Sequence, residues 1–136
     1  MSVLIGRDMS AEQEKAVVGG LLAFNENQIG PSNEEPVKFV AFDVEGVVGG
    51  VIGHTRWNWL YVAKLWVDER ARGQGVGTKL LTAAEDLARK RGCVGASLDT
   101  FEYQARPFYE KLGYELFGTL DGYPPGSRQF YLRKKL

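Results

Sequence analysis

The sequence has few of the residues that build metal clusters and disulfides. Its 136 residues include one cysteine, Cys93, and one histidine, His54. A single thiol cannot form an internal disulfide, so the chain needs no oxidising compartment, and we expect a cytoplasmic protein. One cysteine and one histidine are also too few ligands for a structural zinc cluster, so we expect no metal site.

The sequence also lacks net charge and long apolar runs. Lys plus Arg and Asp plus Glu both total 17, which gives a formal net charge of zero, whereas nucleic-acid-binding domains usually have an excess of basic residues. The apolar run near the start, Val3 to Ile5, is too short for the core of a signal peptide. No stretch approaches the roughly 20 apolar residues of a membrane span. We therefore expect neither a nucleic-acid partner nor a membrane partner.

The length and composition are those of an ordinary globular domain. The residues are 44% hydrophobic and 25% charged, and 136 residues are enough to bury a core without disulfides or metals. We therefore predict a single domain over residues 1–136.

The first third of the chain predicts a short edge strand and then a helix. Val3 to Gly6 is the candidate strand. Ser10 and Gln13 form a capping-box pattern, which indicates that a helix starts there. Gly19 and Gly20 each cost about 1 kcal/mol relative to alanine inside a helix. We therefore expect a kink, or two short helices, before Asn27.

The rest of the chain mixes strands and helices without strict alternation. Residues rich in β-formers predict three strands joined by turns at 43–46 and 57–58, hence an antiparallel meander. Apolar residues at 3.6 spacing predict a helix over 75–91, followed by a strand, a short helix and two strands. The predicted strands are 37–42, 47–56, 59–67, 93–100, 114–120 and 129–133, and the short helix is 105–112. This order predicts an α+β domain, with a mainly antiparallel sheet and one parallel step around the helix at 75–91.

A glycine-rich segment, DERARGQGVGT over residues 68–78, lies between a strand end and a helix start. Glycines at 73, 75 and 77 lose much conformational entropy on folding, and close approach of the backbone to a ligand would explain them. The first N–H groups of a helix lack intrahelical partners, and the helix dipole adds positive charge there. Together these features favour an anion, usually a phosphate. Arg70 and Arg72 would add donors.

Two common phosphate-binding patterns do not fit this segment. A Walker loop needs a Gly-Lys-Ser/Thr sequence, but Lys79 lies between Thr78 and Leu80. The dinucleotide pattern Gly-x-Gly-x-x-Gly, started at Gly73, meets Thr78 at its sixth position. A dinucleotide loop also normally follows the first strand of its unit, not a meander.

The pattern that fits is Arg/Gln-x-x-Gly-x-Gly/Ala, with Arg72, Gly75 and Gly77. It resembles the pyrophosphate signature of the GNAT superfamily of N-acetyltransferases, and in particular small bacterial single-domain members. The preceding strand and the later FYEKLGY, residues 108–114, extend the resemblance over residues 37–136. It implies a mixed sheet flanked by helices, with a central strand that splays from its neighbour. The alternative is a turn without a ligand, which would need one glycine, not three with arginines.

The resemblance implies acetyl-CoA as the co-substrate. Main-chain groups of Leu65 and Val67 would hydrogen-bond the pantetheine arm and polarise the thioester carbonyl. Backbone N–H groups of Arg72, Gly73, Gln74, Gly75, Val76, Gly77 and Thr78 would cradle the pyrophosphate. Many members carry an asparagine before the late helix that contacts pantetheine, and Gln104 has the same donors and acceptors here.

Tyr109 matches the tyrosine of the family that faces the CoA sulfur, so the resemblance implies a general acid for the leaving thiolate. A phenol with a pKa near ~10 has only a modest driving force to protonate a thiolate of pKa near ~8.5. Stabilisation by a hydrogen bond is therefore expected to be the larger part of its role. The alternative role is an aromatic core residue on a short helix.

The acceptor site is the least defined part of the prediction. Tyr61, Asp99 and Tyr123 are the candidate substrate residues, and Tyr61, Asp99 and Glu45 are the candidates for the group that takes the proton of the amine. A structural role competes with each.

The predicted function is transfer of an acetyl group from acetyl-CoA to a primary amine, by direct attack in a ternary complex. The acceptor is left open among small molecules, peptide N-termini, lysines and aminoglycoside-like antibiotics, and so is a homodimer. Two other hypotheses compete with this enzyme: a non-catalytic domain that binds or senses CoA, and an interaction protein.

Overall fold

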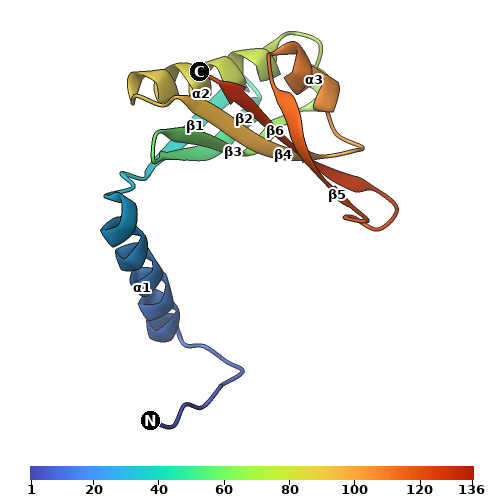
Figure 1. Cartoon of the computed structure of the whole chain (residues 1–136). Coiled ribbons are helices and arrows are strands. Elements are labelled where there is room, and N and C mark those ends of the chain that lie inside the picture. The colour runs from blue at the N-terminus through green and yellow to red at the C-terminus, as the bar shows by residue number, and fades with distance from the viewer. The chain divides into compact units, whose positions relative to one another are not determined.

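The computed structural model describes all 136 residues, and they fall into two compact units, residues 1–32 and residues 33–136. Figure 1 colours the first unit blue and the second from cyan to red. The single domain over residues 1–136 stays a prediction.

The first unit contains one helix, α1 (Ala11–Ile29). The predicted capping box is confirmed: the Gln13 amide donates to the Ser10 hydroxyl at 3.1 Å, and the Ser10 amide donates to the Gln13 side chain at 2.8 Å. The predicted kink is wrong, because α1 runs through Gly19 and Gly20 without interruption. The predicted strand at residues 3–6 is also wrong, since these residues are exposed and pair with nothing.

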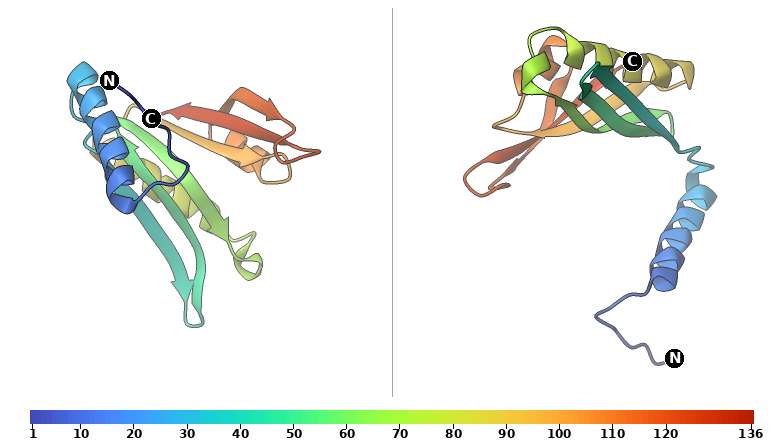
Figure 2. Two further views of the ribbon diagram at one scale, coloured as in Figure 1. Left: turned by 90° about the horizontal axis from the view of Figure 1, so that it is seen from below. Right: turned by 180° about the vertical axis from the view of Figure 1, so that it is seen from behind.

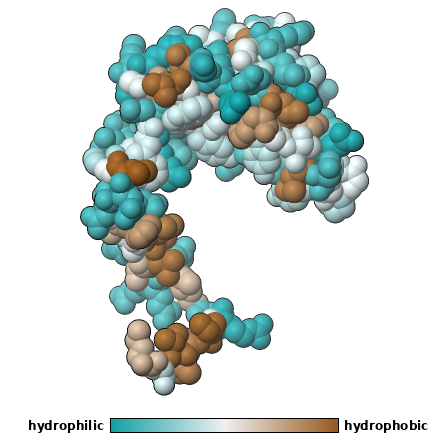
Figure 3. Space-filling view, in the orientation of Figure 1, coloured by the Kyte–Doolittle hydropathy of each residue, from teal (hydrophilic) through white to brown (hydrophobic).

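The side chains of α1 are all at least partly exposed, and none of its residues is buried. Figure 3 shows apolar side chains along it. Val17, Leu21 and Phe24 are among its exposed residues. Neither α1 nor any other helix combines the length and the apolar character required to cross a membrane.

The second unit is built on a six-stranded sheet in the order β1-β2-β3-β4-β6-β5 (Figures 1 and 2). All neighbours are antiparallel except β3 and β4, which are parallel. This confirms the predicted α+β class and the parallel step. The strands are β1 (Glu35–Asp43), β2 (Gly46–Arg56), β3 (Trp59–Val67), β4 (Gly95–Phe101), β5 (Glu115–Asp121) and β6 (Arg128–Lys135).

The parallel step from β3 to β4 passes through the 3₁₀ turn η1 (Glu69–Ala71) and the helix α2 (Val76–Lys90). Figures 1 and 2 show α2 lying along one face of the sheet. Its apolar stripe, which includes Leu81, Ala84 and Ala88, is buried in the core against Leu60 and other strand residues. A shorter helix, α3 (Arg106–Lys111), follows β4.

A buried polar cluster joins α2 to the late strands. Glu85 is 4% exposed, and its carboxylate accepts hydrogen bonds from the Tyr114 hydroxyl at 2.7 Å and the Lys134 ammonium at 2.9 Å. Arg89 on the same helix lies 3.9 Å from Glu85 and 2.9 Å from Asp86. A buried carboxylate needs such partners, because desolvation without them is costly.

The feature of the fold that makes room for a ligand is the separation of β3 from β4. Residues 59–62 of β3 pair with residues 95–98 of β4, and the pairing ends there. On its other edge β3 continues to pair with β2 as far as Val67. The edge of β3 over residues 63–67 therefore has no strand partner on the β4 side. This confirms the splayed central strand that the resemblance implies.

Candidate active site

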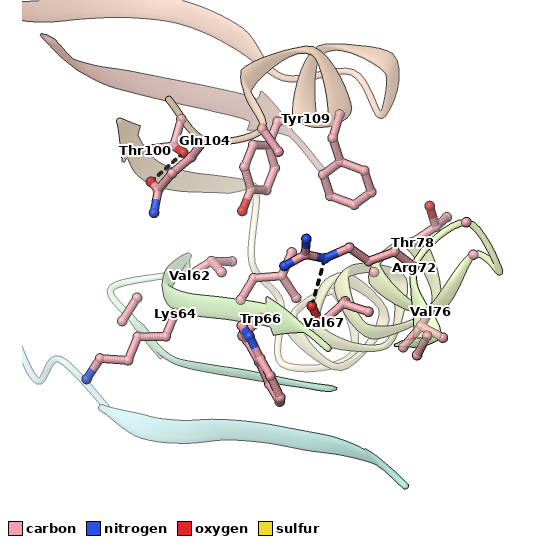
Figure 4. A pocket seen from close by; sticks show the side chains of 18 of the residues that line it. Val62, Lys64, Trp66, Val67, Arg72, Val76, Thr78, Thr100, Gln104 and Tyr109 are labelled. Atoms are coloured by element: carbon pink, nitrogen blue, oxygen red, sulfur yellow. Dashed lines mark hydrogen bonds between the residues drawn. The ribbon is translucent and has the colours of Figure 1, made fainter. Parts of the chain in front are cut away.

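The space between the separated ends of β3 and β4 is a cleft of about 1100 Å³, called the main cleft below (Figure 4). One wall is residues 62–67 of β3, and the opposite wall is the end of β4 with the start of α3. The loop before α2 and the first turn of that helix close one end. An unpaired strand edge exposes a row of N–H and C=O groups, so this cleft is built to take an extended polar chain.

The glycine loop has a backbone conformation that residues other than glycine rarely adopt. Gly73 has φ 77° and Gly75 has φ 75°, and positive φ is inexpensive only for glycine. Gly75 is the N-cap of α2 and offers no side chain to its first N–H groups. The first turn also contains no acidic residue. The N-terminus of α2 thus keeps its free donors and its partial positive charge for an anion in the main cleft.

The third glycine of the loop has a packing role that the sequence did not reveal. A Cβ atom at Gly77 would lie 3.2 Å from Cζ of Phe108 on α3 and 3.6 Å from Cγ2 of Val67. The bare backbone of Gly77 therefore lets α2 lie close to α3 and to the end of β3. Phe108 lines the main cleft beside Tyr109.

The two arginines of the loop have different surroundings. Arg72 lines the main cleft, and its Nε donates to the Val67 carbonyl at 3.1 Å, which is the dashed line between these two residues in Figure 4. Arg70, which we expected to add donors at the helix start, instead binds Asp43 at 2.8 Å and Glu45 at 3.2 Å on the β1–β2 hairpin. The same contact holds Glu45 in an ion pair away from the main cleft, which removes it as a candidate base.

Most of the predicted ligand-binding residues line the main cleft. Leu65, Val67, Gly73, Gly75, Val76, Gly77, Thr78 and Gln104 do so together with Arg72, whereas Gln74 does not. The Gln104 side-chain oxygen accepts hydrogen bonds from the Thr100 hydroxyl at 2.9 Å and the Phe101 amide at 2.8 Å. These bonds fix the turn after β4 and leave the NH₂ group of Gln104 for another partner.

Tyr109 is held by α3 with its ring among aromatic neighbours and its hydroxyl toward β3 (Figure 4). The residue is 9% exposed and lines the main cleft, and its ring lies 5.1 Å from that of Phe108 and 6.0 Å from that of Tyr114. Burial, and then the nearby charge of Asp99, raise the pKa of the Tyr109 phenol above its ordinary value. The phenol is therefore a protonated hydrogen-bond donor at neutral pH.

Asp99 is the only carboxylate among the residues that line the main cleft. Its two oxygens accept hydrogen bonds from the Tyr61 hydroxyl at 2.7 Å and the Gln129 amide at 3.2 Å, and the Tyr131 hydroxyl donates to Gln129 at 2.8 Å. The hydrogen bond to Asp99, with burial and the charge of Asp99, raises the pKa of Tyr61 to about 12. The contributions of Gln129 and Tyr131 were not predicted, because they come from β6, which is distant in sequence and adjacent to β4 only in the fold.

Tyr123 does not line the main cleft. It lies between β5 and β6, and its ring contacts Phe101 at 5.5 Å. Phe101 in turn stacks on Tyr103 at 5.6 Å, and Tyr103 does line the cleft. Tyr103 was not predicted, because a tyrosine in a turn is usually a surface residue.

Residues 7–114 match the model of the acetyltransferase (GNAT) family. The chain belongs to the GNAT acetyltransferase family. An acetyltransferase of Agrobacterium fabrum is 39% identical over 136 residues, which cover 99% of both chains. The blasticidin-S acetyltransferase of Streptomyces morookaense is 44% identical over 91 residues, which cover 66% of this chain and 67% of that protein.

A solved structure agrees with this GNAT assignment. The crystal structure of an acetyltransferase from Agrobacterium tumefaciens has a TM-score of 0.88 and 38% sequence identity, and each chain is covered in full. The predictions of the family, the fold class and an acetyltransferase enzyme that uses acetyl-CoA are thereby confirmed. The roles of individual residues stay predictions.

Proposed function

We propose that this GNAT acetyltransferase transfers the acetyl group of acetyl-CoA to a primary amine by direct attack in a ternary complex. The observation that carries the proposal is the main cleft itself. It joins, in one continuous space, an unpaired strand edge, a helix N-terminus without a cap, a buried tyrosine and a single carboxylate. A two-substrate transfer needs these parts together.

The unpaired edge of β3 suits the pantetheine arm, which has two amide groups to satisfy. In our proposal Leu65 and Val67 provide the main-chain partners, as another strand would. The Val67 carbonyl already accepts one hydrogen bond from Arg72, and a carbonyl oxygen has a second lone pair. The NH₂ group of Gln104 faces the same ligand from the other wall in this proposal.

The glycine loop and the first turn of α2 suit the pyrophosphate. Its two negative charges need several donors at once, and backbone N–H groups at a helix start provide them without a change of shape. Residues 72–78 hold the pyrophosphate in this proposal, with the Arg72 guanidinium beside them. Gln74 takes part only through its backbone, since its side chain is outside the cleft.

Tyr109 acts on the leaving group in this proposal. The amine nitrogen forms a bond to the thioester carbon, and the carbon–sulfur bond then breaks and leaves a thiolate. Because the pKa of Tyr109 is raised, full proton transfer to a thiolate whose thiol has a pKa near ~8.5 is unfavourable. The phenol therefore stabilises the developing negative charge chiefly by donating a hydrogen bond, and the thiolate takes its proton later from solvent.

Asp99 acts on the acceptor in this proposal. A primary amine is mostly an ammonium ion at neutral pH and must lose protons to attack and to become an amide. Asp99 is the one carboxylate of the main cleft, so it attracts the ammonium ion and accepts its proton directly or through water. The Tyr61 and Gln129 hydrogen bonds hold the carboxylate in place.

The test is an assay of thiol release from acetyl-CoA with a panel of primary amines, combined with mass spectrometry of the products. We expect amine-dependent CoA release and a product heavier by one acetyl group. Tight binding of acetyl-CoA without acetylation of any amine, peptide or lysine would instead favour the non-catalytic CoA-binding alternative. Hydrolysis at a rate that no amine changes would contradict direct transfer.

A further inference from the structure

The second unit contains another concave surface, called the aromatic hollow below, with a volume of about 520 Å³. It lies mainly on the sheet face opposite α2, because Tyr61 and Trp59 alternate along β3 with Leu60 and Val62, which are buried in the core. Its lining residues are His54, Arg56, Trp57, Trp59, Leu60, Tyr61 and Ser97.

The indole of Trp59 forms a flat part of this hollow. A Cβ atom at Gly95 would lie 2.5–2.7 Å from three atoms of that ring, so the ring lies directly over the bare backbone of Gly95. Trp59 is nevertheless 40% exposed. Since one face of the ring covers β4, the opposite face is the exposed one. Together with His54 and Tyr61, whose rings are 5.5 Å apart, it gives an aromatic surface open to a ligand.

Tyr61 connects the aromatic hollow to the main cleft. Its ring lines the hollow, and its hydroxyl donates to Asp99 in the cleft at 2.7 Å. The hollow and the only carboxylate of the cleft are thus separated by the length of one tyrosine side chain.

The charges of the hollow disfavour a cation in it. None of its lining residues is acidic, and the Arg56 guanidinium lies 5.1 Å from the Trp57 ring. The ion pair of Arg56 with Glu34 is long, at 3.9 Å, and exposed. An uncharged ring is the group that fits beside Trp59, by offset stacking or edge-to-face contact.

We propose that the acceptor is an amine that carries an uncharged aromatic or heteroaromatic ring a short alkyl chain away. The ring lies in the aromatic hollow against Trp59, and the amine lies beside Asp99. This inference rests on the proposed function, because it assigns the second half of the same substrate.

The first test compares two amines of similar basicity, 3-phenylpropylamine and hexylamine, at saturating acetyl-CoA. An aromatic pair adds about 0.5–1.5 kcal/mol beyond area burial, so we expect kcat/KM to be up to about tenfold higher for the phenyl compound. Binding of both amines to the CoA-saturated protein is measured by calorimetry as well, so that the comparison does not depend on turnover. Equal kcat/KM for the two amines would overturn the inference. If neither amine reacts, equal affinities or undetectable binding of both would overturn it as well.

The second test is Trp59→Leu, with Phe42→Leu as the matched control. Phe42 is an aromatic residue of β1, 73% exposed, and lines neither the hollow nor the main cleft. We expect Trp59→Leu to abolish the preference for the phenyl amine, and the control to keep the preference. A preference retained by Trp59→Leu would overturn the inference. If Trp59→Leu does not fold, the comparison of amines on the unmodified protein decides alone.

The two proposals fail in different ways. Loss of acetyl-CoA binding by the unmodified protein would refute the proposed function. If acetyl-CoA binds normally and kcat/KM is equal for hexylamine and 3-phenylpropylamine, only the assignment of the hollow is refuted. Acetyl-CoA affinity is therefore measured for each variant beside the amine kinetics.

Discussion

Replacement of Tyr109 by phenylalanine removes one hydroxyl group and keeps the ring that packs against Phe108 and Tyr114. A hydrogen bond to a charged group contributes about 1.5–3 kcal/mol, and the raised pKa of Tyr109 makes this bond, not proton transfer, its main contribution. We therefore expect kcat to fall by roughly 10- to 150-fold. The KM for acetyl-CoA changes little, because the thiolate that the hydroxyl stabilises forms only as the reaction proceeds.

Tyr114→Phe is the matched control for this variant. Tyr114 is also a buried tyrosine, but its hydroxyl donates to Glu85 at 2.7 Å and it does not line the main cleft. The control should lose about 1–3 kcal/mol of stability, because a buried carboxylate loses a partner, and keep the kcat of the unmodified protein. Both variants are assayed for thiol release with a reactive amine and unfolded in urea. A Tyr109→Phe enzyme with unchanged kcat would refute the reasoning.

Three further predictions concern titration, the glycine loop and the buried ion pair. Tyrosinate absorbance should show that the pKa of Tyr61 is about 12. In the Asp99→Asn variant this pKa should fall toward its ordinary value. Because the pKa of Tyr61 is higher in the folded than in the unfolded state, its contribution to stability is complete below about pH 10 and is lost as the pH rises toward 12. Tyr61→Phe should therefore flatten the alkaline part of the curve of unfolding free energy against pH. Gly75→Ala should cost about 1–2 kcal/mol of stability, because residue 75 has a left-handed backbone, and should raise the Kd of acetyl-CoA in calorimetry; an unchanged Kd would contradict the loop assignment. Lys134→Met should lower the free energy of unfolding in urea by about 3 kcal/mol, because the Glu85 carboxylate stays buried without its ammonium partner; a variant as stable as the unmodified chain would show that Glu85 is not held by this pair.

The sequence carried enough local signal to predict the centre of the fold. Aromatic and β-branched residues over 59–67 predicted the bounds of β3, and the apolar period over 75–91 predicted α2 to within one residue at each end. The hairpin turn at residues 43–46 and the left-handed pair Trp57 and Asn58 were also predicted as turns, and both are present. These features depend on neighbours in sequence, so sequence reasoning finds them.

The errors have two causes: the balance of local propensities was misjudged in α1, and the other outcomes depended on more distant parts of the chain. Gly19 and Gly20 lower helix propensity, but the capping box and the good helix formers around them outweigh that cost, and α1 is continuous. The run Val3 to Gly6 has β-forming residues but no strand to pair with. Arg70 is adjacent in sequence to the glycine loop, yet Asp43 and Glu45 on a different hairpin bind it.

The candidate site divides in the same way. The glycine loop and Tyr109 were assigned through a motif and a resemblance, and the structure brings them to one cleft. The partners that hold Asp99 come from β3 and β6, at sequence distances of 38 and 30 residues. No sequence spacing reveals such a network, because it is created by the order of strands in the sheet.

The most direct test of the account is a calorimetric titration of acetyl-CoA into the unmodified protein and into Gly77→Val. The Cβ atom of valine at residue 77 would lie 3.2 Å from Cζ of Phe108, so the side chain would press on that ring in the cleft wall. We expect one acetyl-CoA bound per chain of the unmodified protein and much weaker binding to the variant. Absence of saturable binding to the unmodified protein, or equal affinity for a folded Gly77→Val variant, would contradict the claim that the main cleft holds acetyl-CoA.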